Sequence, residues 1–125
     1  MILGIGTDLV ELERIRSFGL ERLATRILHE TEKTHLPQGT KRQVEWLAGR
    51  FAAKEAVAKA AGTGIGNPLG FQDIRIVADK RGCPQVELSS ESRIALGWQS
   101  GVKIPLTISH TLHYATATAI IERRS

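Results

Sequence analysis

The chain contains one cysteine, Cys83, so no disulfide can form within it, and a lone thiol is typical of a reducing compartment. Glycine and proline flank Cys83, and we expect it to lie in a loop or at a strand edge. No hydrophobic run is long enough to cross a bilayer, and the first residues show neither the basic segment nor the cleavage site of a secretory signal. We therefore expect a single cytoplasmic domain over residues 1–125, without a membrane partner.

Aromatic residues make up only 5% of the chain, which is little for stacking nucleic-acid bases. The net charge of +4 favours an acidic partner or an anionic substrate without choosing between them. Basic residues alternate with acidic ones along the chain, and we expect no nucleic-acid partner. A small basic nucleic-acid-binding module is the alternative class, and it predicts salt-sensitive binding without a metal requirement.

The clearest pattern predicts a long helix that begins near Thr40 and ends at Gly62. Apolar side chains recur at helical spacing on one stripe, at Val44, Leu47, Ala48, Phe51 and Ala58. Glu55 occupies the next place on that stripe, and Lys59 lies one turn further on the same side. Two interpretations remain open. Glu55 and Lys59 form a buried ion pair without chemistry, or Glu55 binds a hard divalent cation and leaves Lys59 for an anionic substrate.

A second carboxylate, Asp8, follows the apolar segment that opens the chain, which we expect to be a short buried strand. Gly4 and Gly6 in this segment would allow another backbone to approach closely. We expect a helix from about Leu9, so that Asp8 and Glu11 would form a capping box. The alternative is that Asp8 is a second metal ligand at a strand-to-helix corner, and its two oxygens permit both roles.

The next two helices, expected from Leu9 to Gly19 and over residues 20–29, carry outward-facing arginines. We expect Leu9 and Phe18 to pack inward. The arginines that would form one basic face are Arg14, Arg16, Arg22 and Arg26. Such a face is either an ordinary solvated helix surface or a docking surface for an acidic protein.

After the long helix, the glycines of residues 62–66 suggest a phosphate-binding loop, but the usual phosphate loops follow a strand and open a helix. We therefore expect a helix cap and a turn here. A strand over 71–78, a hairpin turn and a return strand over 85–88 should follow, and then a helix over 91–98.

The last part of the chain predicts a pair of strands over 104–110 and 114–121. The second strand is dense in alanine and threonine, whose small side chains would let the long helix approach. His110 at a strand end can meet an anion when protonated. His110 and His113 have a zinc-like spacing, but no cysteine or third histidine supports a zinc site.

Three blocks carry a family resemblance: GIGTDLV at 4–10, RFAAKEA at 50–56 continuing through GTGIG at 62–66, and TISHT at 107–111 with the strand that follows. Together they resemble holo-[acyl-carrier-protein] synthases, the short 4'-phosphopantetheinyl transferases. The order of the blocks, their spacing and the chain length agree over essentially the whole sequence.

The resemblance implies transfer of the phosphopantetheine arm of coenzyme A to a serine of apo-acyl carrier protein, in support of fatty acid biosynthesis. The other product would be adenosine 3',5'-bisphosphate. It also implies Mg²⁺ held by Asp8 and Glu55. The implied fold is α+β, with a small antiparallel sheet packed on a long central helix. The implied assembly is a homotrimer whose active sites lie at subunit interfaces.

The resemblance also assigns residues. Asp8, Glu55 and Lys59 would be catalytic, and His110 would reach coenzyme A across the interface. The residues expected to contact coenzyme A are Arg50, Lys59, Gly62, Gly64, Ser109, His110 and Thr111. Lys41 and Lys54 would add positive charge around the bound coenzyme A.

Arg14 matches a docking position for the acidic carrier protein, which Arg22 and Arg26 would extend. Two routes stay open for the serine proton, either directly to Glu55 or through a water to another acidic side chain. A metal-dependent nucleotide hydrolase, with the same Asp8 and Glu55 but with water as acceptor, is a further alternative.

Overall fold

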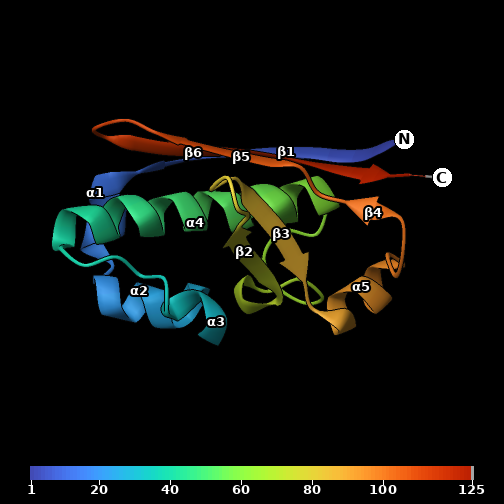
Figure 1. Cartoon of the computed structure of the whole chain (residues 1–125), viewed down its shortest axis with the longest axis horizontal. Coiled ribbons are helices and arrows are strands. Elements are labelled where there is room, and N and C mark those ends of the chain that lie inside the picture. Colours follow the sequence, from blue (N-terminus) through green and yellow to red (C-terminus); the bar gives the residue numbers. More distant parts are fainter. Residues whose placement is uncertain (125) are drawn as a thin grey trace.

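The structure, a computed structural model, describes residues 1–124, and residue 125, the last of the expected domain, lies outside the described residues. Its α+β architecture is the predicted class (Figure 1). The elements in chain order are β1 (Ile2–Glu11), α1 (Leu12–Ser17), α2 (Leu20–Ile27), α3 (Glu30–Lys33), α4 (Thr40–Ala61), the 3-10 helix η1 (Phe71–Asp73), β2 (Ile74–Ala78), β3 (Pro84–Leu88), α5 (Ser90–Leu96), β4 (Val102–Lys103), β5 (Leu106–His110) and β6 (Tyr114–Arg123). Within residues 1–124, no helix is both long and apolar enough to cross a membrane.

The central helix α4 lies between two layers. On one side runs an antiparallel sheet in which β6 is central, with β1 on one edge and β5 and β4 on the other. On the other side lie α2, α3 and α5, while α1 lies alongside the first part of α4 between the sheet and α2, and the β2–β3 hairpin crosses α4 (Figure 1). The small sheet and the long helix are therefore as predicted.

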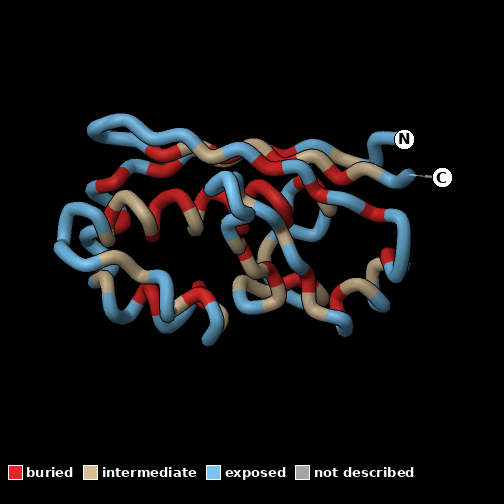
Figure 2. Tube along the Cα trace, in the orientation of Figure 1, coloured by how far each residue is buried: buried red, intermediate tan, exposed pale blue. Residues whose placement is uncertain are grey.

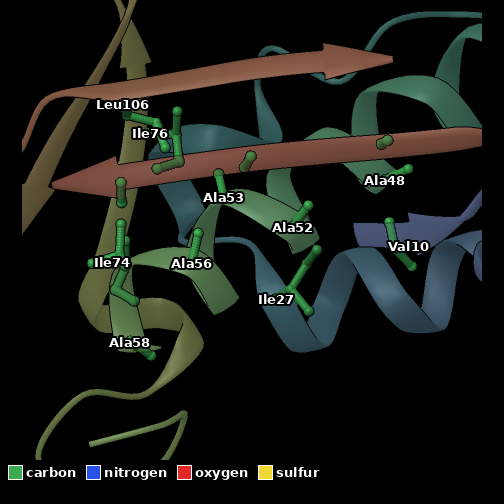
Figure 3. Packing of buried hydrophobic residues seen from close by; sticks show 14 of the residues in the cluster. Val10, Ile27, Ala48, Ala52, Ala53, Ala56, Ala58, Ile74, Ile76 and Leu106 are labelled. Atoms are coloured by element: carbon green, nitrogen blue, oxygen red, sulfur yellow. The ribbon is translucent and has the colours of Figure 1, made fainter. Parts of the chain in front are cut away.

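Small residues bring the sheet close to α4. A Cβ atom on Gly4 or Gly6 would clash with the backbone of Ala60 or Ala56, so only glycine permits this approach. Alternate alanines of β6, at 115, 117 and 119, also face α4 and are buried. Figure 3 shows the alanines of α4 packed among larger side chains such as Ile74, Ile76 and Leu106. The predicted close approach is confirmed at both strands.

The start of the chain differs from the prediction, because β1 continues through Asp8 to Glu11. Asp8 pairs with Ala117 in the middle of the strand, and Glu11, the residue before α1, makes no side-chain capping bond. The capping box is therefore wrong. The reason is the length of β6, whose pairing extends the strand until the Leu12 amide bonds to His113 O.

Leu9 and Phe18 are exposed rather than packed inward. Leu9 lies on a strand, where side chains alternate between faces, and it falls on the face away from α4. Figure 2 shows this alternation of buried and exposed residues along the sheet. Phe18 is the residue after α1, beyond the periodic positions Leu12 and Ile15, which are buried as expected.

The second half of the chain follows the prediction with shifted boundaries. Gly62 caps α4 in the left-handed conformation, and Ser89 caps α5. The segment expected as a strand from residue 71 begins with η1, and α5 stops at Leu96 because Gly97 takes the left-handed conformation. Cys83 is exposed next to the hairpin turn, as expected for a loop residue.

Candidate functional site

Asp8 and Glu55 come from distant parts of the sequence, and the fold places them close enough for the Asp8 carboxylate to raise the pKa of Glu55. Asp8 points from the inner face of β1, and its Oδ1 lies 2.9 Å from Lys59 Nζ. The same ammonium donates to Thr7 O at 3.1 Å. Lys59 therefore pairs with Asp8, and no Glu55–Lys59 ion pair forms within residues 1–124. The interpretation of Glu55 and Lys59 as a buried pair is wrong, because the Lys59 side chain is 54% exposed.

The electrostatics of Glu55 show that the two carboxylates influence each other. Burial raises the pKa of Glu55, and the neighbouring Asp8 carboxylate raises it further. Lys59 and Arg14 act in the opposite direction but do not cancel the effect. A cation placed between the carboxylates would relieve this repulsion.

The chemistry of these donors suits a hard cation. Within residues 1–124, no group of three or more His, Cys, Asp or Glu side chains is arranged to hold a metal ion. The protein would thus supply only the carboxylates of Asp8 and Glu55. Mg²⁺ accepts such a site, because it prefers oxygen ligands and commonly keeps several waters beside substrate phosphates.

A cavity of about 440 Å³ opens beside Glu55, between α1, α2, α4 and η1. Apolar side chains line part of it, and the rings of Phe51 and Phe71 lie there with centroids 5.7 Å apart. Arg14 and Arg26, two of the predicted docking residues, line its rim. Arg22 is exposed on α2 but does not line this cavity.

A second cavity, of about 480 Å³, lies between α4, the β2–β3 hairpin and β5. Arg50 and His110 of the same chain both line it, although His110 was expected to act across a subunit interface. The Arg50 guanidinium stacks over the ring of Trp46 at 3.9 Å. Burial lowers the pKa of Arg50, and Glu32 partly offsets this effect.

The predicted site residues fall into two groups in the single chain. Arg50 and Glu55 are five positions apart, which turns the side chains by about 140° around a helix with 3.6 residues per turn. The cavities beside these residues share no lining residue. The structure therefore does not bring Arg50 and His110 together with Asp8 and Glu55 within one chain.

The remaining predicted contacts lie at the edges of these groups. Ser109 and Thr111 adjoin His110 and line a small hollow of about 270 Å³ on the sheet. Gly62 and Gly64 are exposed just after Lys59, but their amides already donate to the carbonyls of Lys59 and Ala58 as a helix cap. The expected cap and turn are confirmed.

Lys54 does not add positive field to a ligand site, contrary to the prediction. Its side chain is fully buried, and its ammonium lies 2.6 Å from Glu32 Oε1 and 3.1 Å from the Phe71 carbonyl. The other oxygen of Glu32 accepts the amide of Ile76 at 3.0 Å. Burial lowers the pKa of Lys54, and Glu32 opposes that effect. Lys41, by contrast, is exposed at the start of α4.

Sequence reasoning missed Lys54–Glu32 and the contact of Trp46 with Arg50. The signal for Lys54 was available, because alanines surround it on α4 at 52, 53 and 56. A helix that is small and apolar on several sides is buried on several sides, so a long polar side chain within it needs a partner. The identity of that partner, Glu32, depends on tertiary structure.

The comparisons with known proteins identify the family of this chain. Residues 4–117 match the family model described as the 4'-phosphopantetheinyl transferase superfamily. A holo-[acyl-carrier-protein] synthase of Geobacillus kaustophilus is 51% identical, over 98% of this chain and 91% of that protein.

Two solved structures have the same fold. The holo-(acyl-carrier-protein) synthase of Bacillus anthracis, in complex with CoA (3',5'-ADP), has a TM-score of 0.84 and 39% identity, and 99% of each chain is covered. The synthase of Neisseria meningitidis has a TM-score of 0.86 and 38% identity, over 98% of this chain and 100% of that one. This chain therefore belongs to the 4'-phosphopantetheinyl transferase superfamily.

Proposed function

We propose that this protein transfers the 4'-phosphopantetheine arm of coenzyme A to a serine of apo-acyl carrier protein and releases adenosine 3',5'-bisphosphate. The observation that carries the proposal is the meeting of Asp8 with Glu55 in a chain of this superfamily. The reaction would supply the holo-carrier for fatty acid biosynthesis. We place it in the cytoplasm, where the free thiol of Cys83 would stay reduced.

Asp8 and Glu55 would hold Mg²⁺, for which their oxygen donors and mutual repulsion are suited. When bound, Mg²⁺ would draw charge from the diphosphate of coenzyme A and so favour departure of the bisphosphate. The raised pKa of Glu55 is consistent with this role, because a carboxylate destabilised by another carboxylate gains most from a nearby cation.

Lys59 would bind a diphosphate oxygen and stabilise the charge that the leaving group gains. Its side chain is partly exposed, and its partner Asp8 is one of the two proposed metal ligands. The negative charges of coenzyme A would compete with Asp8 for this ammonium, which acts as a mobile point charge on a flexible stem.

Arg50 and His110 would bind the phosphates of the nucleotide end, in the cavity that both of them line. Ser109 and Thr111 would add hydroxyl contacts beside His110. Gly62 and Gly64 would permit close approach of the ligand, because no atom lies near the positions where their Cβ atoms would be.

A neighbouring copy would unite the two groups of residues in a homotrimer. The face of the sheet away from α4 exposes Leu3, Ile5, Leu9 and Tyr114 to solvent. Apolar side chains gathered on one face are typical of an interaction surface. Leu9 and Tyr114 also line the hollow that contains His110. Contact through this face would bring His110 of one subunit to the edge of the next.

The acidic carrier protein would dock on α1 and α2, through Arg14 and Arg26 at the cavity and Arg22 beside them on α2. Arg14 and Arg26 line the cavity next to Glu55, so a carrier bound there would present its serine close to the proposed metal site. The apolar walls around Phe51 and Phe71 would receive the pantetheine arm or an apolar side chain of the carrier.

Mass spectrometry of apo-acyl carrier protein, incubated with the protein, coenzyme A and Mg²⁺, tests the proposal. We expect the carrier to gain the mass of the phosphopantetheine arm. Asp8→Asn and Glu55→Gln should each lower the rate by at least about 100-fold, as losses of transition-state electrostatics do. Glu91→Gln on α5 is the matched control and should keep the wild-type rate.

No mass gain, with an apo-carrier that a known transferase can load, would overturn the proposal. Release of the bisphosphate with no modified carrier would instead identify the alternative, a metal-dependent hydrolase that uses water as acceptor. Salt-sensitive retention of DNA without any transfer would support the nucleic-acid-binding class.

A further inference from the structure

Arg50 is held at the wall of its cavity by an aromatic ring and not by an acid. Its guanidinium carbon lies 3.9 Å from the centre of the Trp46 ring. Within residues 1–124 no carboxylate forms an ion pair with Arg50, and its single hydrogen bond, from Nη2 to Ile76 O, is long at 3.5 Å. The buried Nε atom has no partner among these residues.

With so few polar contacts, the stacked indole ring of Trp46 sets the orientation of the guanidinium. A guanidinium is a planar fork of five donors, and one long hydrogen bond cannot fix the plane of such a group. Stacking on an aromatic face does fix the plane, and it leaves the donor edge free to meet a ligand. Trp46 lies one helical turn before Arg50 on α4, so both side chains rise from the same face of a rigid element.

The side chains around Arg50 indicate which kind of ligand its free N–H donors would meet. Arg42, Glu45 and His110 line the same cavity of about 480 Å³. Glu32 lies behind Arg50 and is already bound to Lys54, so it does not take the guanidinium as a partner. An anion entering the cavity would therefore meet a cation that forms no ion pair with a carboxylate within residues 1–124.

We propose that Trp46 is a positioning residue that orients Arg50 for binding a phosphate of the nucleotide end of the substrate. The inference rests on the proposed function for the identity of that nucleotide. It assigns to Trp46 no contact with the reacting atoms. The indole acts through Arg50, by holding the guanidinium plane before the ligand arrives, so that less entropy is lost on binding.

Titration of the assembled protein with adenosine 3',5'-bisphosphate in a calorimeter tests the inference without turnover. Trp46→Leu removes the aromatic face and should weaken binding about fivefold to tenfold, the effect of losing a partly desolvated cation–π contact. Trp46→Phe keeps an aromatic face and should restore binding to within about twofold of wild type. The matched control is Trp98→Phe, at a buried tryptophan that does not line this cavity, and it should bind as wild type does.

A double-mutant cycle separates positioning from a structural role. In an Arg50→Met background, Trp46→Leu should cause no further loss of affinity, because the side chain it acts through is gone. In steady state, Trp46→Leu should raise KM for coenzyme A by the same factor as the loss in affinity. The KM for the carrier protein and kcat should stay within about twofold. A role confined to folding would instead lower the thermal midpoint without this selective change in KM.

The outcomes distinguish this inference from the proposed function. Wild-type transfer activity with equal nucleotide affinity in wild type and Trp46→Leu would overturn the role of Trp46 and leave the function intact. Equal losses from Trp46→Leu with and without Arg50 would also overturn it. Absence of transfer would overturn the proposed function, whereas the selective loss of nucleotide affinity in the cycle would still support the positioning role.

Discussion

Replacing Lys54 by methionine should lower the free energy of unfolding by about 3–5 kcal/mol, which is the effect of removing one partner from a fully buried ion pair. Methionine fills a similar volume, so the loss would come from charge and hydrogen bonding. The ammonium of Lys54 is the partner of Glu32 Oε1 and also donates to the carbonyls of Ile27 and Phe71. The variant would leave Glu32 buried and negatively charged between α3 and β2, with the Ile76 amide as one of its remaining donors.

Urea unfolding, followed by far-ultraviolet circular dichroism at one fixed protein concentration, measures this change. The matched control is Lys33→Met, on the short helix α3 that also carries Glu32. Its partner Glu30 lies at 3.0 Å, but both side chains reach solvent, so the change should stay within about 0.5 kcal/mol. Both ion pairs are direct contacts, and two differences separate the predicted effects: burial and the two carbonyls that Lys54 also binds.

The combined variant Glu32→Gln with Lys54→Met should recover more than half of the loss, because neither charge then remains buried. A loss below about 1 kcal/mol from Lys54→Met alone would refute the reasoning. It would mean that Glu32 takes up a proton or water without penalty, and that the pair is not a structural link between α4, α3 and β2.

Three further predictions concern the proposed site. The raised pKa of Glu55 means that the folded state binds this proton more tightly than the unfolded state. The contribution of Glu55 to the stability of the metal-free protein should therefore fall as pH rises from the ordinary carboxyl pKa to the pKa in the folded state. Thermal melts in the presence of a chelator should show this fall in the wild type and a smaller fall in Glu55→Gln. Arg14→Glu should raise KM for the carrier protein more than KM for coenzyme A in steady-state assays, and equal effects on both would contradict the docking role. Leu9→Lys, on the exposed sheet face, should yield monomers in sedimentation and lose transfer activity while keeping its circular dichroism, and an unchanged assembly would exclude that face as the interface.

Regular periodicity made the central helix and the sheet predictable. The apolar stripe of α4 repeats over several turns and ends at a glycine with the left-handed conformation, so both its position and its end follow from local chemistry. The glycines of β1 and the alanines of β6 likewise predicted close packing, because small side chains leave few other roles in a buried strand.

The length of β1 was not predictable from local signals. Asp8 followed by Glu11 has the spacing of a capping box, and the isolated segment satisfies both a strand end and a helix start. Pairing with β6 along nine positions decides in favour of the strand, and that pairing joins residues more than a hundred positions apart. Tertiary hydrogen bonds thus override the local preference.

The candidate site was predictable in its members but not in its grouping. Asp8, Glu55 and Lys59 were expected together. Lys59 pairs with Asp8, and both of these residues act on the pKa of Glu55. Arg50 and His110 share a cavity within one chain, whereas His110 was expected to reach the ligand across a subunit interface. The separation of these groups on two sides of α4 follows from the turn of the helix between positions 50 and 55, which a family pattern alone does not display.

The placement of Asp8 and Glu55 explains why small residues surround them. Asp8 lies in the interior of a paired strand and Glu55 in the interior of a helix, so neither carboxylate depends on a loop for its position. The distance between strand and helix is set two residues before Asp8, where Gly6 touches the backbone of Ala56 and Ala60. A methyl group there would push β1 away from α4 and draw the carboxylates apart. The proposed metal site would tolerate little such displacement, because metal–oxygen distances vary by only about 0.2 Å. The glycine and alanine pattern therefore serves the chemistry as well as the packing.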